Sequence, residues 1–144
     1  MSIWRSLLSV ETLNGSLKGM NSTIGILFTE IGEDYIRGTM PVDARTVQPY
    51  GLLHGGASVA LAETLGSTGA AMCVDAEKYL VVGQEINANH VRAARSGLVT
   101  GTARPAHIGG RTHVWTIDIV NEAGQLVCIS RITMAVIKRG ALNP

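Results

Sequence analysis

Aromatic residues, net charge and long apolar runs are all scarce in this sequence of 144 residues. One Phe, two Trp and three Tyr provide little for stacking nucleic-acid bases, and twelve Lys and Arg against eleven Asp and Glu form no basic excess. No segment approaches the ~20 consecutive apolar residues of a membrane span, and residues 1–11 hold too short an apolar stretch for the core of a signal peptide. We therefore expect a cytoplasmic protein that binds neither nucleic acid nor membrane.

Cysteine and cofactor motifs are equally sparse. Cys73 and Cys128 form no Cys-x-x-Cys pair and have no His at metal-ligand spacing, so we expect reduced thiols and no metal site. Gly51 and Gly56 have the spacing of a Walker A motif, but Ala and Ser follow where Lys and Ser or Thr are required. There is no Gly-x-Gly-x-x-Gly either. The sequence thus predicts no metal and no cofactor.

The pattern along the chain predicts one α+β domain covering residues 1–144, because this length suits a single core. A short helix over 9–20 with Ser9 as N-cap and a long apolar helix from 54 to about 74 are expected. Turn residues separate strand-like runs at 26–31, 35–42, 79–92, 97–108, 111–121 and 125–138. We expect a long central helix wrapped by a curved antiparallel sheet, whose uncovered edges favour a homo-oligomer.

Glu63 is the only charged residue within the predicted long helix. Burying an ionised carboxylate without a partner costs several kcal/mol or raises its pKa, so an acid in such surroundings is a candidate nucleophile or general base. Gly56, Ala60 and Ser67 share its helical stripe and leave room for a ligand, and Ser67 could hydrogen-bond a water molecule or the carboxylate.

Gly55 lies in the first turn of this helix, where unpaired N–H groups can stabilise an oxyanion. Eight residues separate Gly55 from Glu63, which at ~1.5 Å per residue is roughly 12 Å. The two groups of one chain are therefore too far apart to act on one carbonyl. We expect the second group to come from another subunit.

The run from Gln48 to Ser67, which reads QPYGLLHGGASVALAETLGS, resembles the hotdog-fold acyl-CoA thioesterases of the 4-hydroxybenzoyl-CoA thioesterase branch of the Arthrobacter type. The resemblance covers nearly the whole chain. The segments PVDAR at 41–45 and GQEINANHVR at 83–92 are similar to the menaquinone-pathway members, which hydrolyse 1,4-dihydroxy-2-naphthoyl-CoA.

The resemblance implies that Glu63 attacks the thioester carbonyl or activates water, while the Gly55 amide polarises that carbonyl. It also implies that Gln48 and His54 position the thioester or water, that Ser67 orients the hydrolytic water, and that dimers or dimers of dimers form sites between subunits. Coenzyme A is part of the substrate. The positions implied to contact it are Gly83, His90, Val91, Arg92, Ala93, His107, Ile108, Gly109, Gly110 and Arg111.

Other functions stay open at this point. The same motif fits proofreading hydrolysis of a misacylated aryl carrier protein, or hydrolysis of phenylacetyl-CoA or a medium-chain acyl-CoA. A hydratase of this fold is less favoured because no Asp is followed five residues later by His. A non-catalytic acyl-CoA sensor or scaffold is the alternative from another class.

Overall fold

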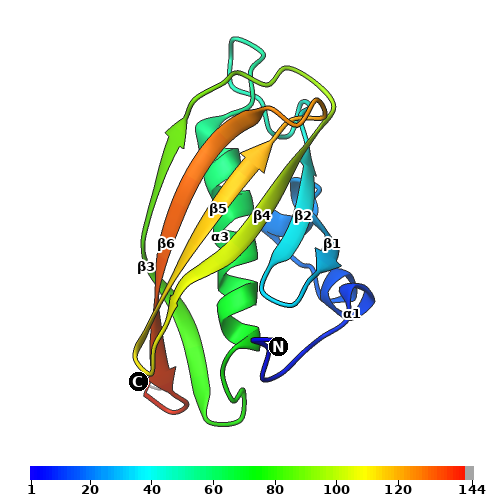
Figure 1. Ribbon diagram of the computed structural model, residues 1–144. Coiled ribbons are helices and arrows are strands. Elements are labelled where there is room, and N and C mark those ends of the chain that lie inside the picture. Colours follow the sequence, from blue (N-terminus) through cyan, green and yellow to red (C-terminus); the bar gives the residue numbers. More distant parts are fainter. Residues whose placement is uncertain (142–144) are drawn as a thin grey trace.

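The computed structural model describes residues 1–141, in which six antiparallel strands form one sheet that curves around a long helix, α3 (Figure 1). The strand order is β1-β2-β4-β5-β6-β3. The helices are α1 (Val10–Gly15), α2 (Met20–Thr23) and α3 (Gly55–Met72). The strands are β1 (Leu27–Ile31), β2 (Ile36–Pro41), β3 (Tyr79–His90), β4 (Leu98–Ile108), β5 (Thr112–Val120) and β6 (Leu126–Lys138).

Helix α3 is enclosed on nearly every side, as its composition predicted, since only Gly56 and Ala71 are exposed along its length. Leu61 and Leu65 are fully buried against the concave face of the sheet. Gly69 allows close packing, because a Cβ there would lie 2.8 Å from the Trp115 ring. The core therefore fixes the helix firmly against the strands that carry the rest of the site.

The two edges of the sheet differ in how they are covered. At β1, the Asn14 side chain donates to the Phe28 carbonyl at 2.9 Å and accepts from the Phe28 N–H at 2.8 Å, so α1 satisfies part of that edge. At the other edge, no element within residues 1–141 pairs with the outer side of the twelve-residue strand β3. Strand β3 is thus the open edge that the sequence led us to expect.

The predicted α+β hotdog architecture is confirmed, with its hairpins and a bulge after Pro105. The helix over 9–20 was predicted too long. Ser9 does cap α1, but that helix ends at Gly15, and Gly19, with φ of 59°, separates it from α2. Three other register shifts were not predicted; they lie between Phe28 and Glu30, between Gly83 and Glu85, and between Ile119 and Val120. No helix within the described residues has both the length and the apolarity to cross a membrane.

Candidate active site

Glu63 lies on the side of α3 that faces β3, and it is partly buried. A Cβ on Gly83 would lie 2.5 Å from the Glu63 Oε1 atom, so the carboxylate occupies the space that a side chain on β3 would fill. No side chain in residues 1–141 forms an ion pair or hydrogen bond with this carboxylate. The carboxylate therefore lies against β3 and has no competing polar partner among these residues.

Ser67 lies one turn beyond Glu63, and its hydroxyl contacts the Met134 sulfur at 3.8 Å. Met134 pairs in register with Gly83, so Glu63 and Ser67 face the same place on the β3–β6 pair. Ser67 makes no hydrogen bond to Glu63. It lines an apolar cavity of about 450 Å³, whose other walls are Ser6, Leu8, Leu13, Thr68, Ala71, Met72, Ala76 and Val81.

His54 caps the start of α3, because its Nδ1 atom accepts a hydrogen bond from the Gly56 N–H at 2.8 Å. The Gly55 N–H has no acceptor within the described part of the chain. It is therefore a backbone donor at the positive end of the helix dipole, available to a ligand. The His54 side chain therefore caps the helix, and its predicted part in positioning the thioester or water stays a prediction.

Six of the predicted site residues line one cavity of about 350 Å³, together with Leu52 and Leu53: Gln48, Gly55, His90, Val91, Arg92 and Ala93. The Gln48 Oε1 atom accepts the Tyr50 N–H, which leaves the amide nitrogen of its side chain without an acceptor among residues 1–141. The His90 ring lies against Gly55, since a Cβ on that glycine would be 2.7 Å from the His90 Nε2 atom. Residues from a loop, a helix and a strand therefore meet here.

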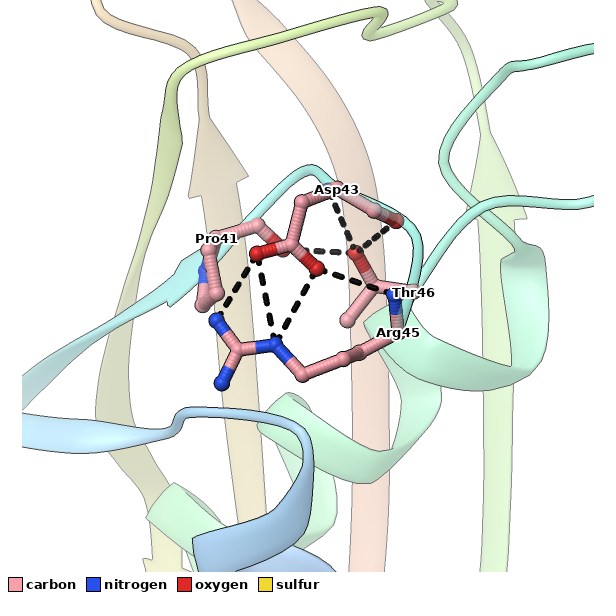
Figure 2. A network of polar contacts seen from close by, with 4 residues as sticks. All are labelled: Pro41, Asp43, Arg45 and Thr46. Carbon is pink, nitrogen blue, oxygen red and sulfur yellow. Dashed lines mark hydrogen bonds and ion pairs between the residues drawn. The ribbon is translucent and has the colours of Figure 1, made fainter.

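The loop that carries Gln48 is anchored by the polar network in Figure 2. The Thr46 hydroxyl donates to the Pro41 carbonyl at 2.6 Å and accepts from the Asp43 N–H at 3.1 Å. Hydrogen bonds from Arg45 lower the pKa of the Asp43 carboxyl. Thr46 is 2% exposed, and its carbonyl accepts the His54 N–H at 2.8 Å. The network thus links the end of β2 to the start of α3.

The other predicted coenzyme A contacts lie elsewhere. Ile108, Gly109 and Gly110 line a separate cavity of about 320 Å³ beside Cys73, which follows the last residue of α3. The cavity that contains His90 is at the first residue of the same helix, so eighteen residues of α3 separate the two groups. At ~1.5 Å per residue they are roughly 27 Å apart in one chain. Arg92 and Arg111 are both exposed.

Sequence reasoning missed three features of the site. Gly83 was predicted only as a substrate contact, and its position against Glu63 was not foreseen. The position of His90 against Gly55 was not foreseen either. The anchoring role of Thr46 was also missed. A polar residue between turn formers gave a weak signal for Thr46, whereas contacts between α3 and β3 have no local signal in the sequence.

Comparison with known proteins identifies the family of this chain. Residues 50–128 match the model of the family described as the thioesterase superfamily. The 1,4-dihydroxy-2-naphthoyl-CoA hydrolase of Escherichia coli is 51% identical over 136 residues, which are 94% of this chain and 99% of that protein. The proofreading thioesterase EntH of Cronobacter sakazakii is 46% identical over 136 residues, covering 94% of this chain and 98% of the relative.

A crystal structure of a thioesterase from Haemophilus influenzae superimposes with a TM-score of 0.94 at 45% identity and covers 99% of both chains. The expectation of an enzyme is thereby confirmed over that of a sensor or scaffold. This chain belongs to the thioesterase superfamily, and it is a thioester hydrolase with the hotdog fold.

Proposed function

We propose that this enzyme hydrolyses an aromatic acyl-CoA, foremost 1,4-dihydroxy-2-naphthoyl-CoA, to the free acid and coenzyme A. The observation that carries the proposal is the Glu63 carboxylate, which lies against Gly83 with no ion-pair partner among residues 1–141, one turn from an apolar cavity. The name of the E. coli relative supports the choice of acyl group. With that substrate the enzyme would act in menaquinone biosynthesis, in the cytoplasm.

Glu63 acts in one of two ways. As a general base it takes a proton from water, and the water oxygen attacks the thioester carbon. As a nucleophile its own oxygen forms an anhydride, which water then cleaves. In both routes negative charge develops on the carbonyl oxygen, where the Gly55 N–H stabilises it, and the C–S bond breaks to release coenzyme A. Neither a metal nor a redox cofactor takes part, and coenzyme A is a portion of the substrate.

The apolar cavity beside Ser67 supports an acyl group without charge. Its volume of about 450 Å³ falls within the ~300–1,000 Å³ of typical small-molecule sites. Leu8, Leu13, Ala71 and Val81 supply apolar walls, and Ser67 is at the side nearest Glu63. A flat aromatic acyl group placed there would bring its thioester towards the carboxylate.

We propose further that each site is shared between two subunits. Glu63 lies beside Gly83, and Gly55 lies beside His90, so α3 and β3 run in opposite directions along each other. If two β3 edges pair antiparallel about a two-fold axis near Ile86 and Asn87, Gly83 is opposite the partner's His90. Glu63 then faces the partner's Gly55. This arrangement overcomes the separation of roughly 12 Å within one chain.

The same pairing brings the start of one β3 strand towards the end of the partner's β3. Ile108 to Gly110 lie near the start of β3, because Tyr79 lines the same cavity. His90 to Ala93 lie at its end. One coenzyme A could therefore contact both groups only across the subunit boundary, which supports a dimer or a dimer of dimers.

A carrier-protein thioester is the second candidate substrate, because a 46% identical relative is named a proofreading thioesterase. The two substrates share the thioester and differ in what surrounds the phosphopantetheine arm. Rates measured across a panel separate them: 1,4-dihydroxy-2-naphthoyl-CoA, phenylacetyl-CoA, a medium-chain acyl-CoA and an aryl carrier-protein thioester. The highest kcat/KM identifies the substrate class, and a carrier-protein maximum would overturn the first choice.

Glu63→Gln tests the reaction itself. The amide keeps the shape of the side chain but is neither a base nor a nucleophile, so acyl-CoA should still bind while hydrolysis falls by at least about 10³-fold. Binding is measured by calorimetry and turnover by release of the coenzyme A thiol. Ser130→Ala, which removes a buried hydroxyl bonded to the Asn87 carbonyl, is the control for a general loss of packing. Unchanged turnover in folded Glu63→Gln would refute the role of Glu63.

A further inference from the structure

His90 is the side chain that lies closest over the first residue of α3. Measured from the position that a Cβ on Gly55 would take, the His90 Nε2 atom is at 2.7 Å and the Cδ2 and Cε1 atoms are both at 3.1 Å. The tip of the ring, rather than its face or its Nδ1 edge, therefore points at Gly55. Any side chain at position 55 would displace it.

This contact limits how far the two N–H donors are from each other. In standard backbone geometry a Cβ is about 2.5 Å from the nitrogen of its own residue, so the His90 Nε2 atom is at most about 5 Å from the Gly55 nitrogen. Two donors that each bond one oxygen at ~2.9 Å, in the usual directions, are themselves about 4–5 Å apart. Gly55 N–H and His90 Nε2 therefore lie close enough to bond a single oxygen atom.

We propose that His90 is the second donor of the oxyanion hole, in which its Nε2–H and the Gly55 N–H together hold the thioester oxygen. The inference rests on the proposed role of the Gly55 amide. It gives His90 a part in the chemical step, beyond a contact with coenzyme A. As the tetrahedral intermediate forms, its negative oxygen accepts both hydrogen bonds, and both are released when the C–S bond breaks and the carbonyl re-forms.

The surroundings of His90 favour this role. Neither ring nitrogen bonds an acceptor within residues 1–141, so no other group fixes the position of the proton on the ring. Of the two tautomers of the ring, an oxygen at Nε2 then favours the one that carries its hydrogen there. Gln48, whose amide nitrogen has no acceptor among the described residues either, lines the same cavity. The cavity thus holds a further N–H donor beside those of His90 and Gly55.

A vibrational measurement tests the proposal without depending on turnover. Benzoyl-CoA labelled with ¹³C at the thioester carbonyl is bound to Glu63→Gln, which should bind without hydrolysing it, and the carbonyl stretch is recorded by infrared difference spectroscopy. Each hydrogen bond to the oxygen lowers this frequency. Adding His90→Ala to Glu63→Gln should raise the carbonyl frequency. Adding His90→Gln instead should raise it less, because the Gln side chain still carries an N–H donor. Asn89→Ala, a change to the exposed neighbour, should leave it unchanged.

Kinetics in the otherwise wild-type enzyme provide the second measurement. Loss of one oxyanion donor commonly costs ~10²–10³ in kcat, so His90→Ala should lower kcat by about 10²-fold and His90→Gln should recover most of it. A higher KM with unchanged kcat and an unchanged carbonyl frequency would overturn the proposal in favour of a coenzyme A contact. A thiophenol ester has a leaving thiolate that needs no protonation. If His90→Ala lowered kcat for coenzyme A esters but not for a thiophenol ester, His90 would protonate the leaving thiolate instead, and the proposal would be overturned too. Continued hydrolysis by Glu63→Gln would count against the proposed function alone.

Discussion

Gly83→Ala is the substitution for which the structure gives the most direct expectation. The new Cβ would lie 2.5 Å from the Glu63 Oε1 atom, and the carboxylate must retreat by about 0.9 Å to reach an ordinary contact of 3.4 Å. A misplacement of about 1 Å at a reacting group can cost ~10²-fold in rate, which is about 2.7 kcal/mol of activation free energy. We therefore expect kcat to fall by roughly 10²-fold, with KM little changed.

The fold should tolerate this substitution. The colliding atom is at the end of a flexible side chain, and Gly83 does not have a positive φ, so alanine fits the strand. Loss of glycine freedom in the unfolded chain should stabilise the protein by roughly 0.4–1 kcal/mol. Release of the coenzyme A thiol gives kcat and KM, and thermal unfolding gives stability. Gly15→Ala, with nothing within 4 Å of its Cβ, is the matched control. A folded Gly83→Ala enzyme with normal kcat would refute the reasoning, and a change in KM alone would make Gly83 a substrate contact only.

Two further predictions concern Gly55. The backbone accepts proline there, because Gly55 begins α3 and His54 has φ of −68° and ψ of 130°, the region favoured before proline. Gly55→Pro and Gly55→Ala both add a Cβ towards His90, but only the proline variant loses the N–H. The kcat of the proline variant should therefore be lower than that of the alanine variant by about 10²–10³-fold. Equal rates would exclude the amide. Glu63→Gln and Gly55→Pro should each be inactive alone. When equal amounts are mixed and exchange subunits, half of the dimers hold one subunit of each kind, and one of the two sites in such a dimer is intact. The mixture should therefore regain about a quarter of wild-type activity. A mixture that stays inactive, while labelled subunits do exchange, would place both groups of a site in one chain.

The fold could be predicted from the sequence wherever its signals are local. Ser9 is a helix cap, Asn121 to Gly124 is a turn, and residues 114–120 alternate, and each of these patterns depends only on neighbours. The bulge between Gly83 and Glu85 could not be foreseen, because it depends on how β3 pairs with β6. The predicted end of the first helix was wrong because α1 ends at Gly15 with Ser16 as its C-cap, and a separate helix, α2, begins after Gly19.

The candidate site divides in the same way. Glu63 and Gly55 were predicted as a carboxylate and an amide on one helix, because helical spacing alone determines their separation. The sequence could not indicate that β3 supplies a matching position for each of them, since contacts between distant segments have no periodic signal. The positions of Gly83 and His90 follow from the register of β3 against β6, which only the folded sheet defines.

Helix α3 and strand β3 contact each other in a reciprocal manner at two glycines. At one point the helix contributes the functional side chain, Glu63, and the strand contributes a glycine, Gly83; at the other the strand contributes His90 and the helix contributes Gly55. In each case the atom nearest the glycine is the tip of a movable side chain and not backbone. A larger residue at either glycine would therefore displace the carboxylate or the imidazole before it displaces the helix. The core between these points, formed by Leu61 and Leu65, would keep α3 in place. Activity should thus be far more sensitive than stability at both glycines, as is expected where a rigid core positions the groups that react.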